Sequence, residues 1–289
     1  MFRSTIAALF LGTSLATVAN AQSGGPPIAY VKFEGAGSAT IYLTNDNGKG
    51  TVKLYAAPSK TKVLHLDLKP GGGEIAFVER RDGSHPVLKV LAFSSSGSAL
   101  GQPRTLDTPC RPYSVDYHPD PARALLIFAG MCSDHMNITT IDTEGRDHQV
   151  LLENRSDYIE GVRWLKDGVS YVYIRDVDAR TEVQQLCRNA CDTGSDVLWS
   201  GHKVGRLDVG RVSNKILFDR GTQYISELDA DTRTVVRENF INGTDGHYSP
   251  DDTRVLYETS GRNTYLDIDS GPSARVAGKG DYGVKDWRK

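Results

Sequence analysis

The sequence has little of what marks membrane, nucleic-acid-binding or helical proteins. Beyond its first residues, no apolar run approaches the roughly 18 residues that a membrane-spanning helix requires. Its 34 Lys and Arg residues are balanced by 36 Asp and Glu residues, so no excess of charge favours nucleic acid or an anionic membrane as a partner. Helical periodicity is absent as well. Short segments rich in Val, Ile, Leu and Tyr instead predict an all-β protein.

The chain also lacks the motifs of common catalytic sites. It contains no G-x-S-x-G nucleophile elbow, no H-E-x-x-H zinc motif and no glycine-rich phosphate loop before a helix. Two segments, Asp176-x-Asp178 and Asp229-x-Asp231, resemble fragments of calcium loops, but the following Gly and the terminal Glu are absent. The seven histidines are scattered, and most are expected at the surface. We therefore expect no catalytic residue and no motif-held metal or cofactor.

Met1 to Ala21 has the pattern of a secretory signal peptide. Arg3 precedes an apolar run, and Ala19-Asn20-Ala21 forms a small-x-small cleavage site. We expect cleavage after Ala21 and a mature protein in the periplasm or secreted, with a formal charge of −3 instead of −2 once Arg3 is removed. Residues 22–27 are predicted to be a flexible arm, and residues 28–289 to be one domain.

The mature chain contains a repeated strand-turn-strand unit. Its clearest copy lies between His247 and Ser260, where Tyr248 and Tyr257 stand nine residues apart around a Ser-Pro-Asp-Asp turn. The first-strand positions of the six copies are Leu68, Tyr117, Trp164, Val209, Tyr248 and Trp287. They are separated by 49, 47, 45, 39 and 39 residues, which matches one four-stranded propeller blade. The repeats predict a six-bladed β-propeller.

The two ends of the chain are predicted to complete one blade together. Trp287 in the sixth copy has no second strand after it, whereas Ile28 to Phe33 supplies an apolar strand without a first strand. The segment from Val284 to Lys289 should therefore pair beside Ile28 to Phe33. Without this pairing the ring would expose a row of backbone donors and acceptors.

Four cysteines in an exported chain indicate disulfides. Cys110 and Cys132 flank a turn centred near residues 120–121, so they are predicted to face each other in the third blade. Cys187 and Cys191 should close a tight loop in the fourth blade. The alternatives are weaker, because a redox-active C-x-x-x-C would need a helix N-terminus and zinc would need a second ligand pair.

One column of residues immediately precedes the first-strand positions. Its members are Asp67, Asp116, Arg163, Asp208, His247 and Asp286. Blade symmetry should place them at one height around the axis, on the innermost strands. Four acids there would raise one another's pKa unless Arg163, water, backbone donors or a bound cation compensated them. We expect hydrogen bonds to neighbouring strands or to channel water, with a channel cation as the alternative.

The loops on one face of the ring are rich in Arg and aromatic residues. Loops between second and third strands open on the same face as the starts of the innermost strands. The candidate binding residues on this face are Arg80, Arg81, His85, Tyr113, His135, Tyr158, Arg175, Arg180, Arg220 and Tyr282. Arg and aromatic side chains commonly anchor protein interfaces. The opposite turns carry mainly Gly, Ser, Asp and Lys. Ordinary solvated loops remain the alternative for the candidate face.

The strand-turn-strand copies, the D-W-R-K ending and the shared terminal blade resemble the C-terminal six-bladed propeller of TolB, the periplasmic component of the Tol-Pal system. The resemblance covers nearly all of Pro27 to Lys289. TolB has an α/β domain before its propeller, whereas this chain has a short arm there. The fourth and fifth copies also read L-K-D-G and G-R-V-S in place of the Ser-Pro-Asp turn.

The resemblance implies a non-catalytic module that binds an envelope protein or acts as a scaffold in the cell envelope. Binding of Pal is implied by similarity alone. The alternative is a propeller that binds a small molecule or carbohydrate, including a sugar-active lyase or hydrolase, which would require clustered His or carboxylates at the channel mouth. The third hypothesis is a protein that has lost its partner or has a purely structural role. We expect a monomer.

Overall fold

The part of the chain that the structure describes consists of β-strands joined by turns and loops. The computed structural model describes residues 27–34, 37–45, 50–155, 157–178, 183–189, 196–202, 204–259, 262–267, 274–275 and 282–287. The predicted signal peptide and most of the arm lie outside these residues. Within them, no helix is long and apolar enough to cross a membrane.

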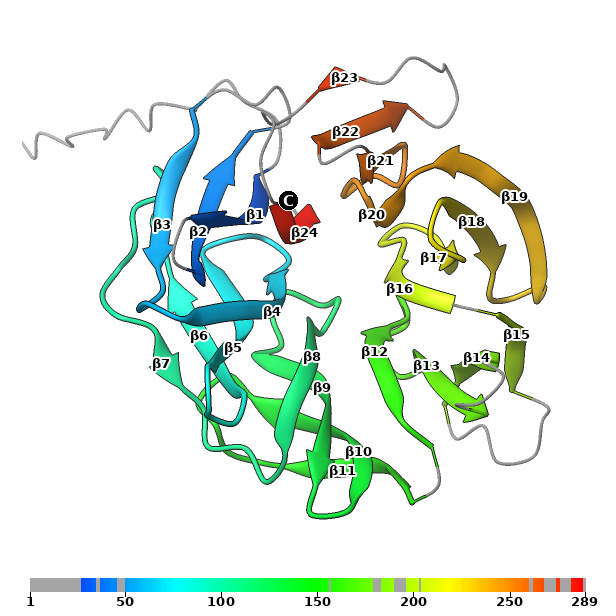
Figure 1. The fold of residues 1–289 in the computed structure, drawn as a ribbon, viewed down its shortest axis with the longest axis horizontal. Coiled ribbons are helices and arrows are strands. Elements are labelled where there is room, and N and C mark those ends of the chain that lie inside the picture. The colour runs from blue at the N-terminus through cyan, green and yellow to red at the C-terminus, as the bar shows by residue number, and fades with distance from the viewer. Residues whose placement is uncertain are drawn as a thin grey trace, which may run out of the picture.

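The described strands form six four-stranded antiparallel sheets around a central axis (Figure 1). From the axis outward, the blade shared by the two termini contains β24 (Tyr282–Trp287), β1 (Ile28–Glu34), β2 (Ser38–Thr44) and β3 (Val52–Ala56). The second contains β4 (Thr61–Leu68), β5 (Glu74–Arg81), β6 (Val87–Ala92) and β7 (Arg104–Thr105). The third contains β8 (Arg111–Tyr117), β9 (Leu125–Cys132), β10 (His135–Asp142) and β11 (Gln149–Asn154).

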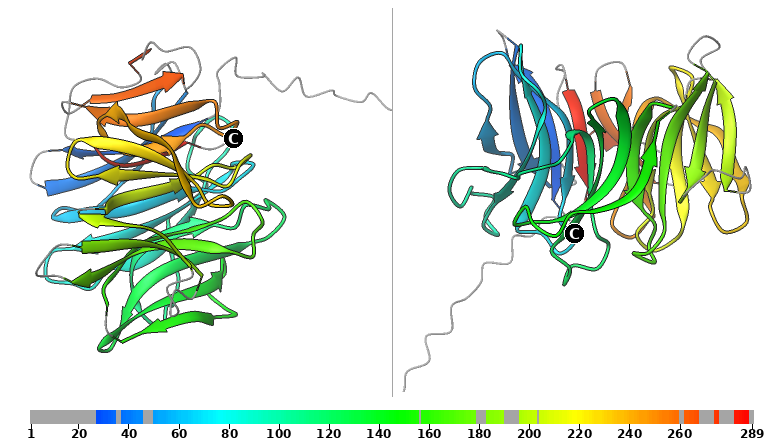
Figure 2. Two further views of the ribbon diagram at one scale, coloured as in Figure 1. Left: turned by 90° about the vertical axis from the view of Figure 1, so that its right-hand side faces the viewer. Right: turned by 90° about the horizontal axis from the view of Figure 1, so that it is seen from below.

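The other three blades follow in chain order. The fourth contains β12 (Ile159–Trp164), β13 (Tyr171–Asp178), β14 (Val183–Arg188) and β15 (Val197–His202). The fifth contains β16 (Val204–Val209), β17 (Lys215–Arg220), β18 (Tyr224–Asp229) and β19 (Thr234–Asn242). The sixth contains β20 (Thr244–Tyr248), β21 (Arg254–Thr259), β22 (Arg262–Asp267) and β23 (Ala274–Arg275). In side view the strands run from one face of the ring to the other (Figure 2).

The predicted closure of the ring is confirmed. Strand β1 pairs with β24 in antiparallel register, with Ile28 opposite Trp287 and Ala29 opposite Asp286. The C-terminal strand begins two residues earlier than predicted, at Tyr282 instead of Val284. The blade therefore joins the two ends of the chain, so that separating the ends requires breaking a strand pair.

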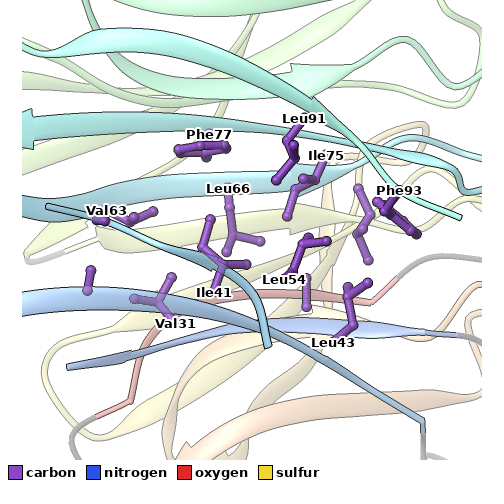
Figure 3. Close-up of a cluster of buried hydrophobic side chains, with 14 residues drawn as sticks. Val31, Ile41, Leu43, Leu54, Val63, Leu66, Ile75, Phe77, Leu91 and Phe93 are labelled. Atoms are coloured by element: carbon purple, nitrogen blue, oxygen red, sulfur yellow. The ribbon is translucent and has the colours of Figure 1, made fainter. Parts of the chain in front are cut away.

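Apolar side chains fill the space between neighbouring blades. Figure 3 shows one such cluster, in which Val31, Ile41 and Leu54 of the first blade face Leu66 and Phe77 of the second. Because a blade is covered on both faces, its middle strands are apolar along most of their length instead of alternating with polar residues. Burial of each large side chain contributes about 1.5–3 kcal/mol.

The repeated aromatic positions of the sequence are packing positions between blades. Tyr117 and Tyr248 are at most 1% exposed. Each hydroxyl donates to a glutamate of the preceding blade, Tyr117 to Glu74 at 3.0 Å and Tyr248 to Glu227 at 2.6 Å. Burial and the neighbouring carboxylate raise the pKa of both phenols, so they remain protonated donors.

The disulfide between Cys110 and Cys132 is confirmed, with a Cα–Cα distance of 4.4 Å. It joins the residue before β8 to the end of β9, next to the paired residues Arg111 and Met131. Cys187 on β14 is also disulfide-bonded. Its predicted partner, Cys191, lies outside the described residues.

Candidate functional site

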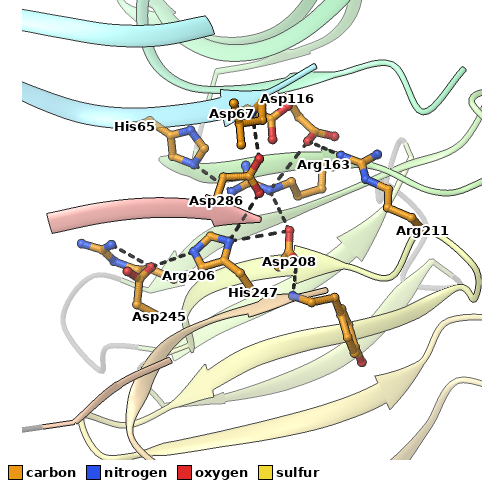
Figure 4. A network of polar contacts seen from close by, with 12 residues as sticks. His65, Asp67, Asp116, Arg163, Arg206, Asp208, Arg211, Asp245, His247 and Asp286 are labelled. Atoms are coloured by element: carbon orange, nitrogen blue, oxygen red, sulfur yellow. Dashed lines mark hydrogen bonds and ion pairs between the residues drawn. The ribbon is translucent and has the colours of Figure 1, made fainter. Parts of the chain in front are cut away.

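The six residues of the predicted column meet at the axis of the ring (Figure 4). They are Asp67, Asp116, Arg163, Asp208, His247 and Asp286, and none is more than 4% exposed. Each comes from the innermost strand of a different blade, one residue before the first-strand position of its repeat. The repeat therefore fixes the height of this ring of polar residues, which we call the channel ring.

The aspartates of the channel ring connect neighbouring blades. Each carboxylate accepts the backbone N–H of the apolar first-strand residue in the next blade. The bonds are Tyr117 to Asp67 (2.6 Å), Trp164 to Asp116 (2.8 Å), Tyr248 to Asp208 (2.9 Å) and Leu68 to Asp286 (2.8 Å). Such bonds to an ionised acceptor are about twice as strong as neutral ones. The expectation of hydrogen bonds to neighbouring strands is confirmed.

Arg163 supplies positive charge to the channel ring. Its Nε lies 3.6 Å from Asp208 and 4.0 Å from Asp116. Its Nη2 lies 2.9 Å from Nε2 of His65, a residue of β4 in the second blade. Because a guanidinium only donates, His65 accepts this bond through Nε2. Burial and the nearby Arg163 hold the pKa of His65 well below its ordinary value, so the imidazole is neutral.

His247 occupies the equivalent position in the sixth blade. Its Nδ1 lies 3.9 Å from a carboxylate oxygen of both Asp208 and Asp286. Its Nε2 lies 3.3 Å from Asp245, which also pairs with Arg206 at 2.8 Å. His247 thus lies between two aspartates of the ring and a third aspartate, Asp245, on its own strand.

Arg211 is a ring contact that sequence reasoning missed. It lies in the turn between β16 and β17, and its Nη2 donates to Asp116 at 3.1 Å. The only signal was the departure of this turn from the Ser-Pro-Asp pattern, where the sequence reads G-R-V-S. Nothing in a single repeat shows that a turn residue reaches the axis.

Three ring residues have the geometry to hold a cation. Asp208, His247 and Asp286 each offer one ligand atom, and these atoms lie within 4.8 Å of one another. Carboxylate and imidazole ligands suit several divalent metals. Arg163 already places a positive charge 3.6 Å from Asp208, so compensation of the acids does not require a metal. The channel cation therefore stays a prediction.

A cavity of about 180 Å³ opens above the ring, at the starts of the innermost strands. We call it the channel mouth; His65, Tyr113, Tyr158, Glu160 and Arg206 are among the residues that line it. The rings of Tyr113 and Tyr158 meet edge to face with centroids 6.0 Å apart. Burial raises the pKa of Tyr158 to about 12, and burial with the nearby Asp176 raises the pKa of Glu160. The mouth thus combines an aromatic pair with polar groups.

The structure divides the predicted binding residues into three groups. Tyr113 and Tyr158 border the channel mouth, whereas Arg80 and Arg81 are exposed at the end of β5 and His85 is exposed in the loop that follows it. Strand register places Arg81 opposite Thr61, at the start of an innermost strand. These residues therefore lie on the face of the channel mouth, as predicted.

The second group is engaged with its neighbours. Arg175 donates to Gln185 at 2.8 Å and lies 3.6 Å from Asp157. Arg220 pairs with Glu238, and its guanidinium lies over the ring of Trp199 at 5.3 Å. These contacts leave less of the two guanidinium groups available for a partner.

His135 also has an internal contact, because its Nδ1 lies 2.9 Å from Asp134. The third group, Arg180 and the side chain of Tyr282, lies outside the described residues. Arg175, Arg220 and His135 are thus engaged with their neighbours, so fewer of the predicted binding residues are available to a partner than the sequence predicted.

No protein-family model and no curated protein matches the sequence. Solved structures do match. TolB from Acinetobacter baumannii aligns with a TM-score of 0.70 at 16% identity, over 91% of this chain and 66% of that chain, so this chain spans about two thirds of its length. A putative TolB from Agrobacterium tumefaciens gives 0.61 at 16% identity, over 88% and 89%. A chain of a nidogen/laminin complex gives 0.67 at 11% identity, over 91% and 98%.

These likenesses define the protein as an all-β propeller with a TolB-like fold. Structures described as an oligogalacturonate lyase and a putative 6-phosphogluconolactonase also align, each with a TM-score of 0.50, at 11% and 13% identity. Because one fold hosts both binding proteins and enzymes, the function has to be argued from the residues of the site.

Proposed function

We propose that the protein is a non-catalytic propeller of the cell envelope that binds another protein across the channel mouth. The observation that carries this proposal is the pair Tyr113 and Tyr158 beside a cavity, on the same face as the exposed Arg80 and Arg81. Aromatic and Arg side chains near a pocket are typical anchors of protein interfaces. The signal-like segment at the N-terminus and the TolB-like fold support an exported, envelope-associated role.

The state of the channel ring supports a binding role over catalysis. Four of its carboxylates accept backbone amides, and Arg163 contacts the carboxylates of Asp116 and Asp208. Groups held in this way maintain the architecture and are poorly placed to exchange protons with a substrate. His65 is neutral, but its Nε2 accepts from Arg163 and is not free to act as a base.

Capture from envelope extract by the chain that begins at Gln22 tests this proposal. The double variant R80E/R81E should reduce recovery of a specific partner about tenfold, because charge reversal at an interface weakens both encounter and binding. Its melting temperature should stay within about one degree, since exposed charges contribute little to stability.

A matched control is R123E, which reverses an exposed Arg on the opposite face. It should leave capture unchanged. Equal loss in R80E/R81E and R123E, or recovery of the same proteins by a Y113A/Y158A variant, would place the interface elsewhere and overturn the proposal.

The second candidate is an enzyme acting on a carbohydrate at the channel mouth. It is favoured by the gathering of His65, Glu160, Asp245 and His247 around one cavity. Oligosaccharide cleavage by purified protein, abolished by H247A and retained in R80E/R81E, would establish this alternative. Absence of cleavage over a broad glycan panel, together with partner capture, supports the binding protein.

A further inference from the structure

A second and larger cavity lies at the opposite end of the channel. It has a volume of about 390 Å³ and is formed where the first turns of five blades converge. Its wall includes Pro70, Pro119, Arg123, Lys166, Arg211 and Pro250. Small-molecule sites commonly measure about 300–1,000 Å³. This cavity, which we call the turn-face cavity, therefore has the size of a ligand site.

Two basic side chains in its wall lack an acidic partner among the described residues. Arg123 is exposed, and its guanidinium makes no hydrogen bond or ion pair with a described residue. The Nζ of Lys166 donates to the backbone carbonyl of Val212 at 3.3 Å and forms no ion pair with a described residue. The third basic residue, Arg211, connects the cavity to the channel ring through Asp116.

The two acids in the wall are turned toward their own backbones. Asp120 accepts the amide of Ala122 at 3.0 Å. Asp167 accepts the amides of Val169 and Ser170 at 2.8 and 2.7 Å. Such turn-closing bonds occupy carboxylate oxygens and stabilise their charge locally. The positive charge of Arg123 and Lys166 is therefore the part that remains available to a ligand.

Apolar groups surround these charges. Pro70, Pro119 and Pro250 come from three different blades, and Val169 at the cavity is 79% exposed. Val212, whose carbonyl holds Lys166, is 62% exposed. Large apolar side chains this exposed are unfavourable in water, and an apolar ligand group would shield them.

The turns around the cavity are fastened to one another. In the third blade, His118 accepts an amide through Nδ1 and therefore donates through Nε2 to the carbonyl of Gly168 at 2.9 Å. Gly168 has a φ of +64°, and a Cβ there would lie 2.5 Å from the His118 ring. The backbone of Lys166 donates to Asn214 of the next blade at 3.3 Å.

The sixth blade completes this set of contacts. The carboxylate of Asp252 accepts the amides of Arg211, Val212 and Ser213 at 2.7, 2.9 and 2.8 Å. Four consecutive blades are thus linked through their turns. A wall held in this way loses little conformational entropy when a ligand binds, which favours affinity.

We propose that the turn-face cavity binds a small organic anion, with its carboxylate or phosphate between Arg123 and Lys166 and its apolar group against the prolines and Val169. This site is at the far end of the channel from the proposed protein interface. The two proposals are therefore independent, and either can fail alone.

Isothermal titration calorimetry at low ionic strength tests the site with phenyl phosphate and benzoate, which separate phosphate esters from carboxylates. We expect one site and a Kd on the order of 1 mM or tighter for at least one of them. R123Q and K166Q should each weaken binding about tenfold, since each removes a charged hydrogen-bond donor. Benzyl alcohol, which lacks the charge, should not bind.

The matched control is R80Q, because Arg80 is exposed on the other face. It should bind both anions like the unmodified protein. Phenyl phosphate should also protect Lys166 from acetylation, measured by mass spectrometry, while leaving Lys62 reactive. Wild-type affinity in R123Q and K166Q, equal losses in R80Q, or binding of inorganic phosphate as tight as that of phenyl phosphate would overturn the proposal.

Discussion

The contacts between neighbouring blades at the channel ring, which we call seams, are of two kinds. At four seams an aspartate of the channel ring accepts the amide of the next blade, whereas at two seams the same position carries Arg163 or His247. An Arg side chain cannot accept an amide proton. Both Arg163 and His247 contact neighbouring aspartates instead. One repeat position therefore performs two tasks, closing seams and balancing the charge of the groups that close them.

The difference shows why the ring is not uniform. Six buried aspartates at one height would repel one another, and their protonation would weaken the seam bonds. The Nε of Arg163 lies within 4.0 Å of the carboxylates of Asp116 and Asp208. Arg211 contacts Asp116 from the turn between β16 and β17. Arg163 cannot accept an amide from the next blade. We infer that it instead stabilises the other seams by balancing the charge of their aspartates.

Deletion of residues 284–289 should have the largest effect. It removes most of β24, including Asp286, and so breaks both the pairing with β1 and the seam to Leu68. We expect a loss of several kcal/mol, comparable with the total stability of a domain, measured by urea denaturation. A truncated chain that melts within a degree or two of the intact one would contradict the closure of the ring.

Replacement of Arg163 by Met should cost about 3–5 kcal/mol, because it leaves buried carboxylates without their nearest cation. Denaturant unfolding at pH 7 should show this loss. The control R146M makes the same substitution at an exposed Arg and should leave the free energy of unfolding nearly unchanged. A loss in R163M no larger than that in R146M would contradict this role of Arg163.

Replacement of Asp67 by Ala should cost about 2–3 kcal/mol, since it leaves the buried amide of Tyr117 without its charged acceptor. The variant D67N keeps an acceptor oxygen and removes only the charge, so its loss should be clearly smaller. Equal losses in D67A and D67N, measured by chemical denaturation, would mean that charge and not the seam bond determines stability.

The neutral His65 should give the smallest effect, visible as a pH dependence. Its pKa is lower in the folded protein than in the unfolded chain, so the unfolded chain binds more protons below the ordinary pKa. Stability from this residue is therefore complete above about pH 6.5 and declines as the pH falls, by at most about 1.4 kcal/mol per pH unit. In H65Q the slope of stability between pH 7 and 5 should be shallower; an unchanged slope would exclude this contribution.

The sequence predicted what repeats within every copy. The nine-residue spacing located the packing positions, and the residue before each of them located the channel ring, because register fixes both. It did not predict Arg211 or His65, which reach the axis from positions that have no constant role in the repeat. The turn face likewise read as ordinary turns of Gly, Ser, Asp and Lys, since the cavity exists only where turns from five blades converge.

Side-chain pairing explains the remaining difference. The sequence placed Arg175 and Arg220 on the correct face but could not show that Gln185 and Glu238 hold their guanidinium groups. Those partners lie on other strands of the same blade, 10 and 18 residues away. Which Arg remains exposed therefore depends on strand register and rotamer, and the sequence gives only the first of these.

Amide hydrogen exchange measured by NMR under native conditions tests the two kinds of seam most directly. The account predicts strong protection of the four amides bound by ring aspartates, at Leu68, Tyr117, Trp164 and Tyr248, and weaker protection at Val209, which follows Asp208 but lies across the seam from Arg163. In D67A, exchange should accelerate at Tyr117 far more than at Tyr248. Equal protection of Val209 and Tyr117 in the intact protein, together with unchanged exchange at Tyr117 in D67A, would contradict it.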